Sequence, residues 1–282
     1  MKKIITCIDG SALSTDVCLA GVWAAGKLHS PLMLLHAIEK QQLVSEDLSG
    51  SISLGAHSSL LQEMAELDQQ RSKIARKLGD EFLHQAASLA AQHGCSDPEL
   101  VQRHGGIVEA ITDLEEQARL VVLGRSGIHS SERFRALGSH IEQIIRRVQT
   151  PVLIASQDFR APRSFMLAYD GRDTADRAVQ RILAGGLLRQ LDCHLVSVKS
   201  NRPDSEEKLR QTEALLQDNG FNVQASLLEG PIFASLQQYK QEHEIELHVM
   251  GAFSRSKLAT VFLGSNTLKM LEQSNTPLLI MR

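Results

Sequence analysis

The feature that most constrains this chain is an internal repeat, because two copies of one pattern require two copies of one folding unit. A strand-like run ending in Asp-Gly occurs twice, as IITCIDG at Ile4–Gly10 and as FMLAYDG at Phe165–Gly171. A second block recurs as VVLGRSG…LGS…TPVLI and as HVMGAFS…LGS…TPLLI, with its Gly-Ser and Thr-Pro pairs both 126 residues apart. We therefore predict two tandem domains, at residues 1–156 and 163–282, joined by the proline-containing linker Ser156–Pro162.

The first copy is longer than the second between its two blocks. The Asp-Gly pairs are 161 residues apart, so the first copy carries 161 − 126 = 35 extra residues. The excess follows Ile38, where the Ser-, Gln- and Gly-rich segment Glu39–Gln62 leads into a helical pattern that runs to His93. We expect a variable surface loop and a lengthened helix there.

Short apolar runs alternate with helical patterns such as Thr15–Leu28 and Ile141–Val148. Continuous apolar strands separated by helices indicate a parallel sheet that is covered on both faces. Right-handed crossovers then make each copy a doubly wound α/β sandwich. The predicted strands are Lys3–Ile8, Leu32–Ala37, Glu99–Arg103, Leu120–Leu123 and Val152–Ala155 in the first copy, and Phe165–Tyr169, His194–Val198, Asn222–Leu228, Leu247–Met250 and Leu278–Met281 in the second.

The recurring blocks predict a ligand site, because open parallel sheets bind ligands beyond the carboxyl ends of their strands. The Asp-Gly pairs follow the first strands, and glycine loops follow the fourth strands. Glycines allow close backbone approach, successive N–H groups can form an anion nest, and a capped helix N-terminus attracts phosphate. A simpler reading stays open: glycine suits any strand-to-helix turn, and aspartate before glycine often only shapes the turn. Two interpretations are also open for the cations of these loops: they contact phosphate, or they are solvated charges. These cations are Arg125, Arg133, Arg135, Arg255 and Lys257.

These blocks resemble the universal stress protein family over nearly the whole chain, twice. Its ATP-binding members carry G-x2-G-x9-G-[ST] after strand 4 and an aspartate that closes strand 1. The resemblance implies an adenine nucleotide alpha hydrolase-like fold, with two five-stranded sheets in strand order 3-2-1-4-5. The first copy has one residue too many between Gly127 and Gly138, and the second has Ser254 in place of the second glycine. Because spacing controls geometry more strictly than one small-residue exchange, the second copy is the favoured site.

The resemblance also implies particular contacts and partners. The implied ligand is ATP or a related nucleotide, with Mg²⁺ on the phosphates as an option. The final strands, Thr150–Ala155 and Thr276–Met281, pair in such proteins, which implies an intramolecular pseudo-dimer and leaves a homodimer as an option. Carried over residue by residue, the nucleotide contacts are Asp9, the Ala37 backbone, Gly124, Gly127, Gly138 and Ser139 in the first copy, and Asp170, the Val198 backbone, Gly251, Ser254, Gly264 and Ser265 in the second.

Composition argues against several other classes of function. The net charge of −3 is unsuited to a nucleic-acid or membrane-surface binder. The chain shows no secretory signal and no run of about 18 apolar residues, so we expect a cytoplasmic protein. Eleven histidines form no metal-binding motif, and we expect His243 and His248 at the surface. The cysteines stand singly and are expected as reduced, mostly buried thiols, at Cys7, Cys18, Cys95 and Cys193.

We therefore expect a nucleotide-binding stress-response protein that senses or signals by ligand occupancy. No nucleophile and base stand together in the loops, so at most slow ATP hydrolysis is expected, and the fold does not require it. The rival is a tandem scaffold or interaction module whose two sites have degenerated.

Overall fold

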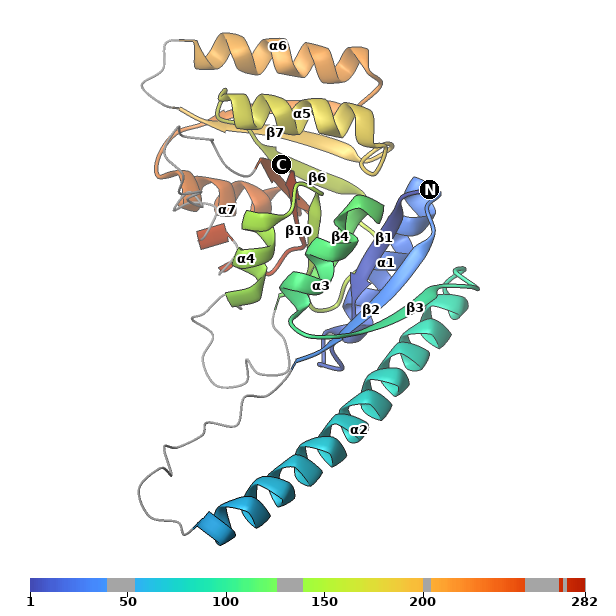
Figure 1. Cartoon of the computed structure of the whole chain (residues 1–282). Helices are drawn as coiled ribbons and strands as arrows, with labels where there is room; N and C mark the ends of the chain where they lie inside the picture. The colour runs from blue at the N-terminus through green and yellow to red at the C-terminus, as the bar shows by residue number, and fades with distance from the viewer. Residues whose placement is uncertain (40–53, 126–138, 200–203, 252–268, 271–272, 282) are drawn as a thin grey trace.

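The computed structural model describes residues 1–39, 54–125, 139–199, 204–251, 269–270 and 273–281. In this part of the chain, helices cover both faces of one ten-stranded sheet (Figure 1). The sheet comprises β1 (Lys3–Cys7), β2 (Leu32–Ile38), β3 (Glu99–His104), β4 (Ala118–Gly124), β5 (Val152–Ala155), β6 (Ser164–Ala168), β7 (Asp192–Val198), β8 (Val223–Leu228), β9 (His248–Gly251) and β10 (Leu278–Met281). The helices are α1 (Ser14–Leu28), α2 (Leu54–Gln92), α3 (Ile107–Leu114), α4 (Ser139–Arg147), α5 (Asp173–Gly185), α6 (Ser205–Asp218) and α7 (Ile232–Glu242), with a 3₁₀ turn, η1, at Glu115–Gln117.

The sheet runs in the order β3-β2-β1-β4-β5-β10-β9-β6-β7-β8. The first five strands are parallel to their neighbours and stand in the order 3-2-1-4-5. Read inward from the far edge, the last five give the same order, also with parallel pairs. The predicted α/β fold class and the predicted strand order are therefore confirmed, but the two predicted five-stranded sheets are joined into one sheet of ten strands.

The two halves meet where β5 and β10 pair antiparallel. Leu153 lies opposite Leu279, between the pairs formed by Ile154 with Leu278 and Val152 with Ile280. Every residue of these two strands is buried, as their uninterrupted apolar sequences predict. The last strand of each half therefore lies in the middle of the sheet, where its backbone groups are hydrogen-bonded to strands on both sides and form no open edge.

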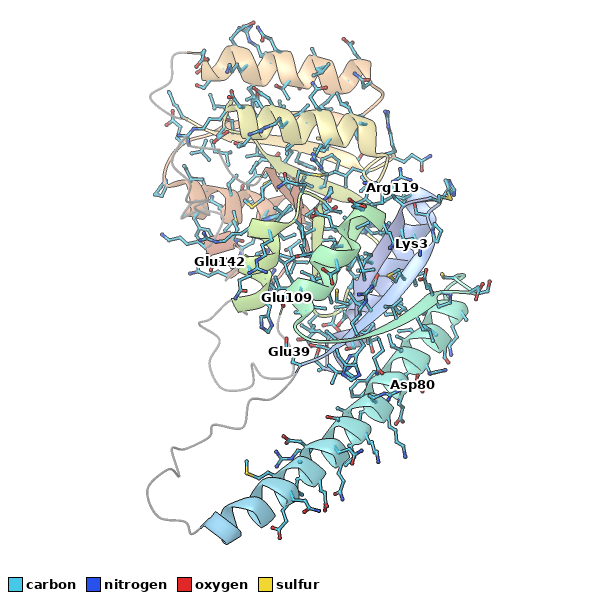
Figure 2. The ribbon with its side chains drawn as sticks, in the orientation of Figure 1. Lys3, Glu39, Asp80, Glu109, Arg119 and Glu142 are labelled. Atoms are coloured by element: carbon cyan, nitrogen blue, oxygen red, sulfur yellow. The ribbon has the colours of Figure 1, made fainter. Side chains whose placement is uncertain are left out.

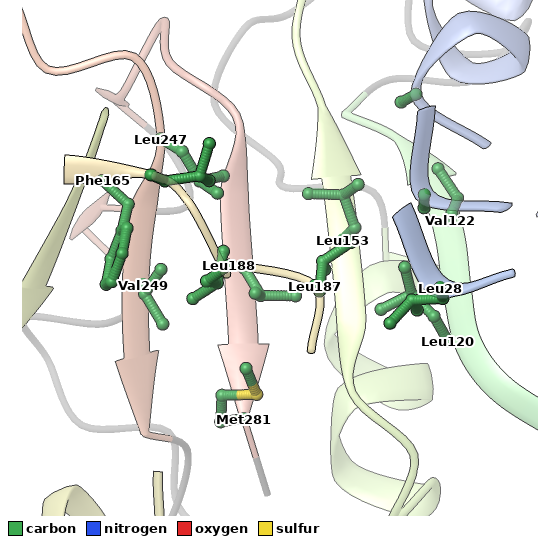
Figure 3. Packing of buried hydrophobic residues seen from close by; sticks show 14 of the residues in the cluster. Leu28, Leu120, Val122, Leu153, Phe165, Leu187, Leu188, Leu247, Val249 and Met281 are labelled. Carbon is green, nitrogen blue, oxygen red and sulfur yellow. The ribbon is translucent and has the colours of Figure 1, made fainter. Parts of the chain in front are cut away.

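Two hydrophobic layers lie on opposite faces of the sheet, and both continue across this junction. One layer contains Leu153 and Leu279 and packs under α1, α2, α5 and α6. The other contains Ile154 and Ile280 and packs under α3, α4 and α7. In Figure 3, Leu153 lies between side chains of the first half, such as Leu120, and side chains of the second, such as Leu187. Neither layer is confined to one half.

Helix α2 is the largest departure from the repeat. It spans 39 residues, and only its second part packs on the sheet, through Leu83, Ala86 and Ala90. Its first part extends away from the sheet (Figure 1). The lengthened helix is as predicted, but it begins at Leu54, inside the segment 39–62 where we expected a loop, and residues 40–53 lie outside the described ranges.

Two further expectations concern membranes and cysteines. No helix in the described residues combines the length and the apolar character needed to cross a bilayer. All four cysteines are described and free, with Cys18 and Cys193 buried and Cys7 and Cys95 partly buried, so the prediction of unpaired thiols is confirmed.

Candidate functional site

The strand order brings the two recurring blocks together at one edge of each half-sheet. β1 pairs with β4, and β6 pairs with β9, in both cases parallel, so their carboxyl ends lie side by side. Asp9 and Gly10 follow β1, while Gly124 ends β4. Asp170 and Gly171 follow β6, and Gly251 ends β9. The predicted meeting of the first and fourth strand ends is found in both halves.

Both aspartates shape the turn that they begin. In the first half, Oδ1 of Asp9 accepts hydrogen bonds from the Ser11 backbone N–H at 2.9 Å and the Ser14 hydroxyl at 3.0 Å. In the second half, Oδ1 of Asp170 accepts one from the Arg172 backbone N–H at 3.1 Å. The following glycines have φ of +75° at Gly10 and +68° at Gly171, a region that favours glycine. The turn role of Asp-Gly is thus real. The second oxygen of each carboxylate takes no part in these turn bonds, although Oδ2 of Asp170 lies 3.6 Å from Nε of Arg172.

The backbone at the end of the second strand faces the same edge. The Ile8 N–H donates to the Leu35 carbonyl at 2.8 Å, so Leu35 directs its peptide groups toward β1. Alternate residues of a strand direct their peptide groups to the same side, so the peptide groups of Ala37 also point toward the β1 side of β2. At Ala37, however, β1 has already ended. In the second half, the Tyr169 N–H donates to the Val196 carbonyl at 2.9 Å, and Val198 follows by the same rule. The backbones of Ala37 and Val198 therefore offer a donor and an acceptor beside the aspartate turns.

An aromatic pair covers the turn of the first half. A β-carbon at Gly10 would collide with the ring of Phe82, which α2 holds over the turn. The ring of Phe82 makes an edge contact with His36, at 5.8 Å between ring centroids. His36 is fixed by a 2.7 Å hydrogen bond between its Nδ1 and the Ile8 carbonyl. The first candidate site therefore has an apolar, aromatic wall.

Cations cover the turn of the second half instead. Nζ of Lys208, on α6, donates to the Gly171 carbonyl at 2.9 Å and lies 3.6 Å from an oxygen of Asp204. Nε of Arg172 lies 3.6 Å from Oδ2 of Asp170, and both side chains are more than half exposed. Helices α2 and α6 each follow the second strand of their half. Phe82 and Lys208 therefore occupy equivalent positions in the two halves, each beside the glycine of the aspartate turn. The two candidate sites differ in electrostatic character.

A groove adjoins the second aspartate turn, between α5 and α6. The described residues enclose about 240 Å³ there, below the roughly 300–1,000 Å³ of small-molecule sites. On its wall, the Tyr169 hydroxyl donates to Oδ1 of Asp176 at 2.6 Å. Burial, and then this hydrogen bond, raise the pKa of Tyr169 to about 12, so the phenol stays protonated. The groove is lined by Tyr169, Asp176, Val179, Gln180, Lys208, Gln211, Thr212 and Leu215.

Several predicted site residues cannot be compared with the structure. Ser139 is the first residue of α4, as expected for the start of that helix, but its side chain is not described. Arg125 is described and does not lie free in solvent: its Nη2 donates to the Thr276 carbonyl of the other half at 3.2 Å. The residues outside the described ranges are Gly127, Gly138, Ser254, Gly264 and Ser265, with the cations Arg133, Arg135, Arg255 and Lys257.

The histidine prediction is half wrong. His243 is exposed as expected, but His248 is only 2% exposed. His248 begins β9, an inner strand between β6 and β10 with helices over both faces, so neither side of it reaches the surface. Burial, then the charges of Lys240 and Arg125, lower the pKa of His248 to about 3. Among the described residues, no group of three His, Cys, Asp or Glu side chains is arranged to hold a metal ion.

Sequence reasoning missed Phe82, His36 and Lys208. Each reaches its turn from an element far away along the chain, so no local motif marks it. Their only sequence signal is position, on the second strand of a copy or on the helix after it.

Comparison with known proteins decides the family. The family model described as "Universal stress protein family" matches residues 1–156 and, again, residues 162–282. The chain belongs to the universal stress protein family. A curated universal stress protein of Synechocystis sp. is 29% identical over 287 residues, covering 100% of both chains.

Solved structures share the fold of this universal stress protein. One from Archaeoglobus fulgidus DSM 4304, also a universal stress protein, has a TM-score of 0.72 at 18% identity, covering 99% of this chain and 98% of its own. Another, from Pseudomonas aeruginosa UCBPP-PA14, has a TM-score of 0.64 at 16% identity, covering 100% and 93%. These neighbours span both halves, so the tandem arrangement is not peculiar to this chain.

Proposed function

We propose that this universal stress protein binds ATP or a closely related nucleotide at the carboxyl edge of its half-sheets and signals through occupancy. The observation that carries the proposal is the convergence at each edge of three groups from three strands. The first group is the aspartate turn after the first strand. The second is the backbone of Ala37 or Val198 at the end of the second strand, which points toward that turn, and the third is the glycine that ends the fourth strand. A backbone donor and acceptor suit the edge of a base, and a glycine loop suits phosphates.

The chemistry of an ionised carboxylate fixes which end of the nucleotide it would meet. Such a group only accepts hydrogen bonds, so Asp9 or Asp170 can accept from a ribose hydroxyl or the adenine amine, or ligate Mg²⁺. Direct contact with a phosphate oxygen would place two negative charges together. We therefore propose that the aspartates hold the nucleoside or the metal ion, while the phosphates extend toward Gly124 or Gly251 and the loops that follow them.

We propose the second half as the stronger site. Lys208 and Arg172 lie at its aspartate turn, on the same sheet edge as Gly251, and add positive charge to the edge that a polyphosphate would approach. In the first half, the corresponding wall is the ring of Phe82, which attracts a base better than a phosphate. This difference agrees with the sequence spacing, which also favours the second copy.

The paired halves suggest how occupancy is read. We propose that the chain acts as an internal pseudo-dimer, in which β5 and β10 rigidly join two ligand edges. A ligand that binds one loop conformation better than another shifts the population of that conformation. The altered loop surface would then be recognised by a partner protein, and no chemical turnover is needed.

The test is direct. We expect the purified protein to release adenine nucleotide on denaturation, or to bind added MgATP well below millimolar in calorimetry. Asp170→Asn keeps a turn acceptor but removes the charge, so it should weaken binding about tenfold if the carboxylate holds a hydroxyl or Mg²⁺. Asp9→Asn should have a smaller effect. Asp218→Asn, at the exposed end of α6, is the matched control and should change nothing.

The rival function is a scaffold with degenerate sites, and the Phe82 ring over Gly10 is the observation that favours it. A scaffold would retain no nucleotide, show no submillimolar affinity and be indifferent to both aspartate substitutions. Slow hydrolysis would appear as phosphate release above a protein-free control that Asp170→Ala abolishes.

A further inference from the structure

The first part of α2 carries large apolar side chains that nothing in the described structure covers. Leu67, Ile74 and Leu78 are 53%, 58% and 46% exposed. In Figure 2, α2 before Asp80 runs away from the body of the fold. It first meets the sheet near Arg76, whose backbone carbonyl accepts a hydrogen bond from Nε2 of Gln102 on β3 at 3.0 Å. Apolar side chains grouped on one element are more informative than scattered ones, because grouped exposure marks an interaction site.

These residues follow the spacing of a coiled-coil seam. Met64, Leu67, Arg71, Ile74 and Leu78 are separated by three, four, three and four residues. That is the a/d repeat of a heptad, with Met64, Arg71 and Leu78 at a and Leu67 and Ile74 at d. The seam is apolar apart from Arg71.

The seam faces away from the sheet of its own chain. Ile74 precedes the buried Leu83 by nine residues, about two and a half turns at 3.6 residues per turn. The two side chains therefore lie on opposite sides of the helix. Leu67 precedes Leu83 by 16 residues and lies within about 20° of the same opposite side. Its own half-sheet cannot cover this seam while Leu83, Ala86 and Ala90 stay packed.

Charge is divided along the same stretch of helix. The seam begins among acidic residues and ends among basic ones, and all of them are exposed. One helix laid antiparallel on an identical helix would set the acidic end of each against the basic end of the other. The acidic residues are Glu63, Glu66 and Asp68, and the basic residues are Arg71, Lys73, Arg76 and Lys77.

We propose that a second copy of this chain covers the seam, in an antiparallel two-helix coiled coil. In this register Met64 packs against Ile74 of the second copy, and Leu67 packs beside the stem of its Arg71. Glu63 and Lys77 both occupy g positions, which face each other in antiparallel pairs, so Glu63 meets Lys77 of the second copy twice by symmetry. By the same rule, Asp68, at e, faces Asp68 of the second copy, and an Arg71 guanidinium from each chain lies near that pair and offsets its charge.

The parallel arrangement is disfavoured by the same residues. It would place Arg71 directly against Arg71 in one a layer. It would also set Glu63, at g, against Asp68, at e, of the second copy. Like charges at these positions select against a partner or an orientation. The proposal is independent of nucleotide binding, since no residue of the seam lies at the carboxyl edge of the sheet.

Sedimentation of the full chain over a range of concentrations tests the dimer. We expect a shift from the 31.1 kDa monomer toward twice that mass. Leu67→Ser with Ile74→Ser should weaken dimerisation at least about tenfold with unchanged far-UV circular dichroism, because both side chains are exposed in the monomer. Gln69→Ser with Ser72→Ala, exposed positions of the same turns off the seam, is the matched control and should dimerise normally.

Charge exchange tests the orientation. Glu63→Lys alone should weaken the dimer, and Glu63→Lys with Lys77→Glu should restore it. A parallel dimer would instead be strengthened by Glu63→Lys, which would meet Asp68. Gln70→Cys should cross-link to itself through a short bis-maleimide, because 70 lies at the twofold axis of the antiparallel register. A wild-type chain that stays monomeric, or a Leu67→Ser/Ile74→Ser dimer as tight as wild type, would overturn the proposal.

Discussion

A β-carbon at Gly251 would lie 2.5 Å from the carbonyl oxygen of Thr174. The end of β9 thus lies directly against the first turn of α5, and glycine is required there for packing whether or not a nucleotide binds. A substitution at this proposed site residue consequently changes stability as well as any binding.

We predict that Gly251→Ala lowers the free energy of unfolding by about 1–3 kcal/mol, the usual cost of overpacking, because a backbone carbonyl cannot rotate away as a side chain can. Urea denaturation measures the loss. Gly26→Ala is the matched control: it lies in α1 with no atom within 4 Å of its added β-carbon, and it should be neutral or stabilising. An equal response of both variants would disprove the close contact.

Acid should destabilise the fold through His248. Its folded pKa, lowered by burial to about 3, lies below the value of about 6.5 for an unfolded histidine, so the unfolded chain takes up the proton first. Stability contributed by this residue is therefore complete above about pH 6.5 and is lost as the pH falls toward 3, by up to about 1.4 kcal/mol per unit. Unfolding free energies of wild type and His248→Gln at pH 7.5 and 5.5 should diverge in slope.

A second histidine serves as the control for that comparison. His84 lies on α2 with a side chain that is 65% exposed. His84→Gln should keep the pH slope of the wild type. If His248→Gln also keeps it, the buried histidine does not control the acid response.

The contact between Leu153 and Leu279 at the junction should contribute to the stability of both halves. Leu153 and Leu279 face each other and are both fully buried, so Leu153→Ala and Leu279→Ala should each cost about 2–5 kcal/mol. Because the two residues are in contact, the double variant should depart from additivity by at least about 0.5 kcal/mol. Leu215→Ala, at a leucine that is 37% exposed, should cost much less. We also expect one cooperative transition, and separate melting of the halves would count against the continuous core.

The thiols should report opening of the fold. Burial raises the pKa of Cys18 and that of Cys193 to about 12, so almost no reactive thiolate exists at pH 8. We predict that native protein labels slowly at both, and that all four cysteines label at once in urea. Peptide mapping after a short pulse measures this. The pKa of Cys95 is also raised by burial, but its partial exposure should make it faster than Cys18. Rapid native labelling of Cys193 would contradict the buried second half.

Much of the architecture followed from local pattern. The repeat of Asp-Gly, Gly-Ser and Thr-Pro defined two halves, and the apolar runs gave every strand to within about two residues of its end. The prediction of a surface position for His248 was wrong because an inner strand of a sheet that is covered on both faces has no solvent-exposed side. The first turns of α2 were not predicted because serine and glutamine occur both in exposed helices and in loops.

The sequence by itself determined the class of fold, the family and the positions where the chain must turn, because these depend on residue periodicity and on glycine. Only the tertiary structure decided what surrounds those turns. Phe82 reaches Gly10 and Lys208 reaches Gly171 from helices whose placement depends on packing over the whole sheet. The difference in charge between the two edges, and the uncovered seam of α2, are consequences of that packing and have no local signature.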